Sequence, residues 1–73
     1  MTSPHTIDTS GLSCPQPVLL FLQAVKAAPD GAFLVIVDNE ASRENVSRAA
    51  RTRGFVVEPR DRDGGLCHLS IHK

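Results

Sequence analysis

The stretch Ala32-Phe33-Leu34-Val35-Ile36-Val37 decides the fold of this chain. It is an unbroken apolar run that ends in β-branched residues, a pattern typical of a central buried strand. Turn-forming residues bound it, with Pro29-Asp30-Gly31 before it and Asp38-Asn39-Glu40 after it. The sequence therefore predicts a sheet built around this strand, and the neighbouring segments must pack against it.

An amphipathic helix is predicted before this strand, from Pro15 to Ala28, because apolar residues recur there at spacings of three and four. The expected inward face consists of Val18, Leu19, Leu22 and Val25. Leu20 and Phe21 lie off this stripe, so we expect some apolar surface near the start of the helix.

A second helix is predicted after the central strand and ends near Thr52. Asn39 or Ser42 can cap its N-terminus, and Gly54 is a good residue to end it. Its inward positions are Val46, Ala49 and Ala50. A mildly basic face carries Arg43, Arg48, Arg51 and Arg53. A solvated surface is the favoured interpretation of these arginines, with a docking patch as the alternative.

Three more strands complete a βαβαββ order: His5–Thr9, Phe55–Arg60 and Leu66–His72. Residues 61–65 form the hairpin loop between the last two. Right-handed crossovers place both helices on one face of the sheet. We therefore predict an α/β (α+β) two-layer sandwich with an open sheet face, as a single domain over residues 1–73. Residues 1–4 are expected to be a disordered lead.

Composition excludes several classes of protein. With 73 residues and a formal net charge of zero, the chain is not built to hold nucleic acid by bulk charge. No stretch approaches the roughly 20 apolar residues of a membrane span, and the start lacks the pattern of a signal peptide. Two cysteines without such a signal indicate free thiols in a reducing compartment. We expect a cytoplasmic monomer.

Cys14 is the candidate reactive residue, because it lies where the polar turn 10–13 gives way to the first helix. Pro15 suits the first helical position, where its missing N–H group would have no partner in any case. The free N–H groups and the positive end of the helix dipole favour an anion there, and thiols in such places have a lowered pKa. Pro17 replaces the second cysteine of a Cys-x-x-Cys motif, which excludes dithiol chemistry within the motif.

The run Gly11-Leu12-Ser13-Cys14-Pro15-Gln16-Pro17, followed by this helix, resembles the Cys-Pro-x-Pro signature of the TusA-like (SirA-like) sulfur-carrier family. The resemblance covers nearly the whole chain. Residues 35–47 are most similar to the N-terminal TusA-like domain of YedF-type proteins. In that branch a DsrE-like domain often follows, and there is a link to selenium metabolism. The present chain would be a standalone member or an excised domain.

This resemblance implies a fold similar to the C-terminal domain of translation initiation factor three, with sheet order 1-2-4-3 and an antiparallel last strand. It implies that Cys14 carries a persulfide sulfur, supported by Pro15 and Pro17. The donor would be a cysteine desulfurase or another sulfurtransferase. The acceptor would be an enzyme of tRNA thiolation, of cofactor metabolism, or of sulfur or selenium metabolism. No cofactor and no independent catalytic pocket are expected.

Two other classes of function stay open at this stage. One is a redox or regulatory interaction module in which Cys14 senses oxidation. The other is an RNA-binding module, which fold analogy alone suggests. Zero net charge and the absence of Tyr and Trp count against stacking on RNA.

The remaining reactive side chains have structural interpretations. Cys67 alternates with Leu69 and Ile71, which places it on the helix-covered face, with core packing as the favoured role. In the family's sheet order one strand separates it from the Cys14 region, about 10 Å, so we expect no disulfide. His68 and His72 lie about 13 Å apart along a strand, too far to share a metal ion.

Two further expectations concern the loops. Asp38 and Glu40 are explained by helix capping. The loop 61–65 should lie near Cys14, where it could shape the docking of a partner.

Overall fold

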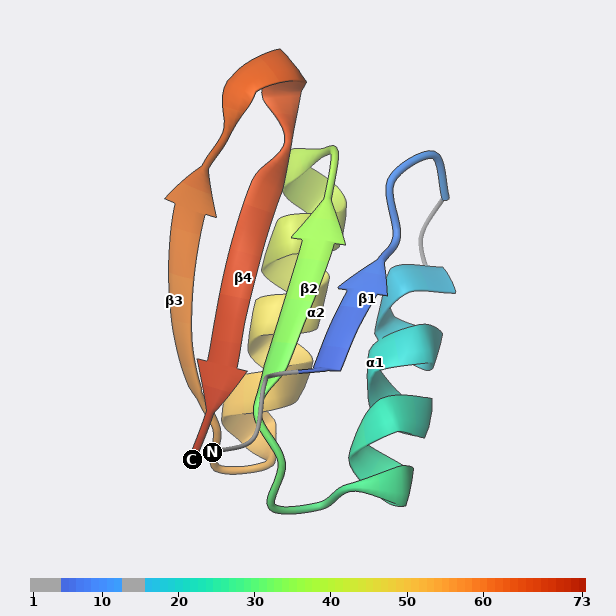
Figure 1. Cartoon of the computed structure of the whole chain (residues 1–73), viewed down its shortest axis with the longest axis vertical. Coiled ribbons are helices and arrows are strands. Elements are labelled where there is room, and N and C mark those ends of the chain that lie inside the picture. Colours follow the sequence, from blue (N-terminus) through green and yellow to red (C-terminus); the bar gives the residue numbers. More distant parts are fainter. Residues whose placement is uncertain (1–4, 13–15) are drawn as a thin grey trace.

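The structure is a computed structural model that describes residues 5–12 and 16–73, and its elements follow the predicted βαβαββ order (Figure 1). The strands are β1 (His5–Asp8), β2 (Phe33–Val37), β3 (Val56–Asp61) and β4 (Cys67–His72). The helices are α1 (Gln16–Ala27) and α2 (Glu40–Thr52), with a short 3-10 turn, η1 (Asp63–Gly65), between β3 and β4. The predicted lead over residues 1–4 lies outside the described residues.

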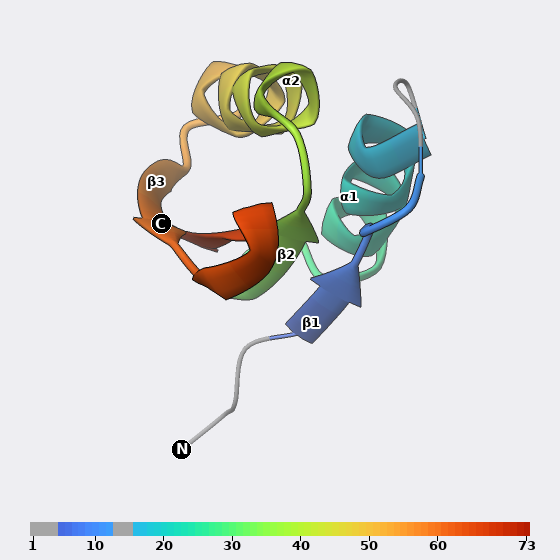
Figure 2. The same cartoon turned by 90° about the horizontal axis from the view of Figure 1, so that it is seen from above.

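The sheet has the order β1-β2-β4-β3, which confirms the expected 1-2-4-3 arrangement. β1 is parallel to β2, and β4 is antiparallel to both β2 and β3. Seen from above, both helices lie on the same side of the sheet (Figure 2). The fold is therefore the predicted two-layer sandwich, with one sheet face covered by helices and the other open.

Alternation along the inner strands sets the core. Phe33, Val35 and Val37 of β2 face the helices and are buried, while Leu34 and Ile36 lie on the open face and are half-buried. β4 repeats this pattern, with Cys67, Leu69 and Ile71 buried. Because a strand alternates its side chains between faces, one apolar run supplies both the core and the centre of the open face.

The predicted inward face of α1 is wrong in one respect. Phe21 is fully buried, whereas Leu19 is 50% exposed. The inward face passes through Pro17 and Phe21, with Val18, Leu22 and Val25 half-buried at its margins. Two overlapping stripes satisfy the same spacing of three and four. Packing decides between them, because Phe21 has aromatic partners within the core.

These partners are Phe33 and Phe55, whose rings meet that of Phe21 edge-on at centroid distances of 5.6 and 6.1 Å. Phe33 and Phe55 also meet each other edge-on, at 5.8 Å. Edge-to-face contacts at this range add to the free energy gained by burying the rings. The three phenylalanines of the chain thus join α1, the start of β2 and the segment before β3.

The ends of α2 agree with the sequence. The Asn39 side chain caps the N-terminus, and Gly54 follows the helix with a φ of +85°, a conformation that glycine adopts without strain. Val46 and Ala50 are fully buried, and two polar residues of the same helix, Ser42 and Ser47, are buried as well.

We expect Phe21→Ala to lower the free energy of unfolding by about 3–5 kcal/mol, because it removes the ring that joins two others in the core. Leu19→Ala, in the same helix, should change it by less than about 0.5 kcal/mol because Leu19 is half exposed. Urea unfolding of both variants measures the difference. Equal losses would contradict the observed orientation of α1.

Candidate functional site

One end of the sheet brings together the segments around the cysteine motif. The strand residues there are Asp8 of β1, Val37 of β2, Asp61 of β3 and Cys67 of β4, and we call this end the motif edge. Both helices begin at the motif edge (Figure 1). The predicted site residues Cys14 and Pro15 lie in the connection between β1 and α1, outside the described residues. Pro17 is described, and it is buried in the first turn of α1.

The carboxylate of Asp38 joins the two loops of the motif edge. Its Oδ2 accepts a hydrogen bond from the amide of Gly11 at 2.6 Å, and its Oδ1 accepts one from Nδ2 of Asn39 at 2.9 Å. Asn39 Oδ1 in turn accepts from the amide of Ser42 at 2.7 Å and so caps α2. The hydrogen bond from Gly11, with a smaller contribution from Asn39, holds the pKa of Asp38 below its usual range.

The turn that leads to the motif is built from local hydrogen bonds. Asp8 Oδ1 accepts from the amide of Ser10 at 3.0 Å and from its hydroxyl at 2.6 Å, and these bonds lower the pKa of Asp8. The buried Thr9 hydroxyl donates to the carbonyl of Ile36. Gly11 has a φ of +81°, which few side chains tolerate. The chain thus enters the motif from a fixed turn.

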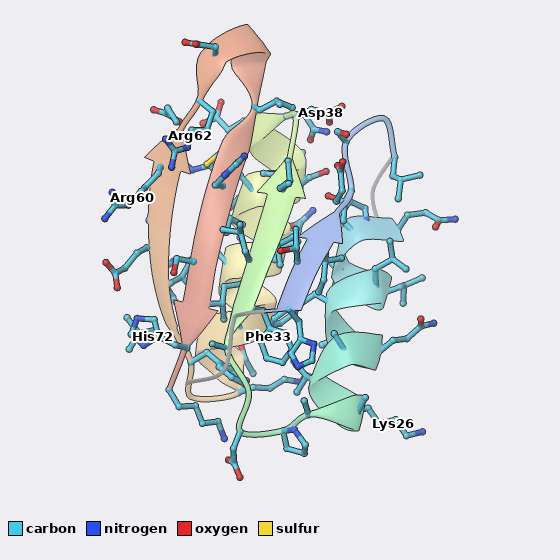
Figure 3. The ribbon with its side chains drawn as sticks, in the orientation of Figure 1. Lys26, Phe33, Asp38, Arg60, Arg62 and His72 are labelled. Carbon is cyan, nitrogen blue, oxygen red and sulfur yellow. The ribbon has the colours of Figure 1, made fainter. Side chains whose placement is uncertain are left out.

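The capping role expected for Asp38 is wrong, because Asn39 caps α2. The Asp38 carboxylate instead binds the amide of Gly11, 27 positions earlier in the chain, and we call this contact the clasp. Figure 3 shows Asp38 at the motif edge. It also shows Arg60, which is on β3, and Arg62, which follows the end of this strand. A local pattern could not reveal the clasp. The parallel pairing of β1 and β2 could have suggested it, because both strands end at the same edge.

Cys67 is a free thiol that is 6% exposed and lies on the helix-covered face, as predicted. It borders an open polar hollow of about 230 Å³ between the start of α2 and the β3–β4 connection. The lining also includes Asn39, Glu40, Arg43, Asp61 and Gly65. The loop 61–65 therefore lies at the motif edge. Cys14 lies outside the described residues, so the expected closeness of this loop to Cys14 stays a prediction.

The arginines of α2 are mostly solvated. Arg48 pairs with Glu44 of the same helix at 3.2 Å, with both side chains about two-thirds exposed, and such pairs contribute little to stability. Arg51 and Arg53 are exposed. Arg43 differs, because it is half-buried and lines both the hollow beside Cys67 and a neighbouring one of about 240 Å³ between α2 and β3.

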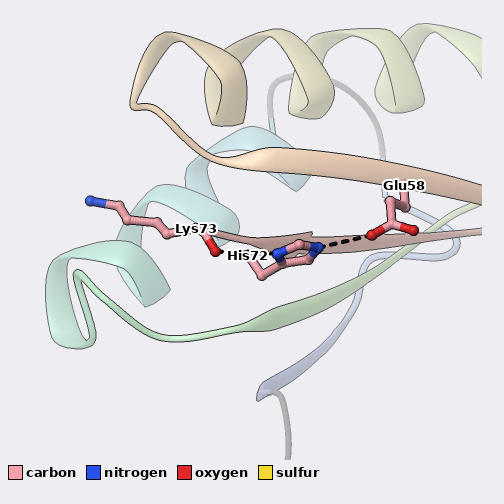
Figure 4. A network of polar contacts seen from close by, with 3 residues as sticks. All are labelled: Glu58, His72 and Lys73. Carbon is pink, nitrogen blue, oxygen red and sulfur yellow. Dashed lines mark hydrogen bonds and ion pairs between the residues drawn. The ribbon is translucent and has the colours of Figure 1, made fainter.

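The histidines of β4 lie on the open face. His72 Nε2 lies 2.9 Å from Oε1 of Glu58 on β3 (Figure 4). The hydrogen bond between the two side chains raises the pKa of His72 and lowers that of Glu58, and the attraction between their charges acts in the same direction. Within residues 5–12 and 16–73, no three His, Cys, Asp or Glu side chains gather as a metal site would require.

The fold and the motif define a class of small SirA-like proteins. The crystal structure of a SirA-like protein from Desulfitobacterium hafniense matches this chain with a TM-score of 0.87. The two sequences are 33% identical, and the match covers 92% of this chain and 93% of the other. At this identity and coverage the likeness extends beyond the fold to the family.

The family model described as sulfurtransferase TusA matches residues 5–73. The chain therefore belongs to the TusA family, whose members act as sulfur carriers. In the described part of the chain, neither helix has the length and apolar character needed to cross a membrane.

We expect Asp38→Asn to weaken the dependence of stability on pH in acid. The folded-state pKa of Asp38 is lowered, so its contribution is present above the unfolded pKa of about 3.9 and is lost as the pH falls through the lower folded value. Thermal unfolding from neutral to strongly acidic pH measures this. Asp63→Asn, which removes an exposed carboxylate of η1, is the control and should keep the wild-type slope. Identical curves for Asp38→Asn and wild type would contradict the clasp.

The Glu58–His72 pair has the opposite dependence on pH. The raised pKa of His72 means that its contribution is complete below the unfolded value of about 6.5 and is lost as the pH rises through the folded value. An NMR titration of the His72 ring should show its pKa fall toward 6.5 in Glu58→Gln. Glu44→Gln removes a carboxylate of α2 instead and should leave it unchanged. Equal values in wild type and Glu58→Gln would show that the contact is absent in solution.

Proposed function

We propose that this protein is a sulfur-relay carrier whose Cys14 accepts a persulfide sulfur and passes it on. The donor is a cysteine desulfurase or another sulfurtransferase. The acceptor is an enzyme of tRNA thiolation, cofactor synthesis, or sulfur or selenium metabolism. The observation that carries this proposal is membership of the TusA family over residues 5–73, which include the run Cys14-Pro15-Gln16-Pro17.

The surroundings of the motif support this assignment. Pro17, the last residue of the motif, is buried in the first turn of α1, which anchors this end of the motif. The clasp from Asp38 to Gly11 anchors the chain directly before the motif. A short segment held at both ends can present one side chain at the surface, and the N-terminus of α1 favours an anion there.

The transfer is an exchange between sulfur atoms. The Cys14 thiolate attacks the terminal sulfur of the donor's persulfide, and a new S–S bond forms as the donor's own S–S bond breaks. The donor leaves as a thiolate, and Cys14 holds the persulfide. The same exchange, with Cys14 as the leaving thiolate, delivers the sulfur to an acceptor. No net oxidant or reductant is needed.

Partner enzymes supply the rest of the chemistry in this proposal. The hollows beside α2 are open and polar, and their lining mixes arginines with carboxylates, which does not resemble a pocket for a small substrate. The half-exposed Leu19 lies near the start of α1, shortly after the motif in sequence, and offers an apolar side chain that a partner could contact.

Intact-protein mass spectrometry after incubation with a cysteine desulfurase and cysteine tests the proposal. We expect a gain of one sulfur atom that a reductant removes. Cys14→Ser should abolish the gain. The matched control is Cys67→Ala, which leaves Cys14 as the only thiol and should keep it.

Thiosulfate with a sulfurtransferase is the second donor to be tested. A gain that persists in Cys14→Ser would assign the sulfur to Cys67 and contradict the proposal. No gain from either donor would favour the redox or regulatory module instead.

A further inference from the structure

The side of α2 that faces β3 carries three polar side chains in one stripe. Arg43, Ser47 and Arg51 recur every four residues, which places them on the same face of the helix. At a rise of about 1.5 Å per residue, the two arginines begin about 12 Å apart with Ser47 midway between them. All three line the hollow of about 240 Å³ between α2 and β3, which Pro59 of β3 also lines.

The hydroxyl of Ser47 is an unused hydrogen-bonding group in this hollow. Ser47 is 6% exposed, and no described residue forms a hydrogen bond with its side chain. Buried hydroxyls nearly always have a partner. The hydroxyl of Ser42 also has none among the described residues, but Ser42 is 1% exposed and lines neither hollow. Ser47 therefore differs, because it can offer its donor to a group that enters the hollow.

The two arginines add positive charge that the fold does not neutralise. No described carboxylate lies within ion-pair distance of Arg43 or Arg51, whereas Arg48 pairs with Glu44 at 3.2 Å. Arg43 is half-buried, so its position is restricted before any ligand binds. A guanidinium presents planar donors that match the two oxygens of a carboxylate. Two guanidinium groups and a hydroxyl around one hollow thus suit an oxyanion.

The carboxylates of the same hollow indicate which oxyanion fits. Glu40 and Glu44 also line it, and Asp61 lines the adjoining hollow, which shares Glu40 and Arg43. A nucleic acid would bring a series of phosphates against these negative charges. A protein partner can place one carboxylate between the arginines and neutral or basic side chains against the acids, which is how charge patterns select partners. The mixed lining therefore favours a protein.

We propose that the hollow between α2 and β3 is a docking site for an acidic side chain, Asp or Glu, of a partner protein. Arg43 and Arg51 bind its carboxylate from two sides, and Ser47 donates a hydrogen bond to it. Arg43 also lines the hollow at the motif edge, so a partner held here lies beside that edge. The site contains no residue of the cysteine motif and does not depend on the proposed function.

The probe is a short peptide with one central Glu flanked by Lys and Ser, added to the folded protein at low salt. Shifts of the amide signals along α2 in ¹⁵N–¹H NMR measure its affinity. We expect Arg43→Gln and Arg51→Gln each to weaken binding about tenfold, and Ser47→Ala about fivefold, as the loss of one hydrogen bond predicts. The matched control is Arg60→Gln. It removes the same charge next to Pro59 but on the opposite face of β3, and it should bind the peptide as the wild type does.

The rival ligands are a single-stranded RNA oligonucleotide, sodium acetate and the same peptide with Gln in place of Glu. Tighter binding of the RNA, or equal shifts with acetate alone, would assign the hollow to a nucleic acid or a free anion and overturn the inference. Equal binding of the Gln peptide, equal losses in Arg60→Gln and Arg43→Gln, or no shift along α2 would also overturn it. If Arg43→Gln does not fold, the exposed Arg51 still provides the test. Cys14→Ser should bind the Glu peptide normally, which keeps this result separate from the sulfur-transfer assay.

Discussion

The hydrogen bond from the Gly11 amide to the Asp38 carboxylate is the contact on which the motif edge depends. It fixes the connection after β1 to the connection after β2, across 27 positions of sequence. Through Asn39 it also reaches the cap of α2. One carboxylate therefore sets the spacing between the segment that leads to Cys14 and the first turn of the second helix.

The aromatic part of the core lies at the end of the sandwich opposite the motif edge. The three phenylalanine rings pack together there and join α1, the start of β2 and the segment before β3. A chain of 73 residues has room for one core, so its stability is modest. The apolar end holds Phe21 and Phe33, the two largest fully buried side chains, and the motif edge contains the buried hydroxyls of Thr9 and Ser42.

Much of this fold can be predicted from sequence, because the strongest signals are local. The apolar run of β2, the alternation of β4 and the glycine after α2 each specify an element without knowledge of the rest. The inward face of α1 could not be predicted, since the stripes through Leu19 and Phe21 satisfy the same periodicity. Only the positions of Phe33 and Phe55 in the folded chain decide between them. The clasp between Gly11 and Asp38, and the unpaired hydroxyl of Ser42, likewise depend on long-range packing.

The amide proton of Gly11 provides the most direct measurement of the clasp. A pH titration followed by ¹⁵N–¹H NMR should find this proton shifted downfield at neutral pH by its bond to the carboxylate. It should move upfield in acid, with a midpoint below the ordinary aspartate value of about 3.9, as Asp38 becomes protonated. A Gly11 amide that keeps an unstructured chemical shift at every pH would show that the two loops are not joined.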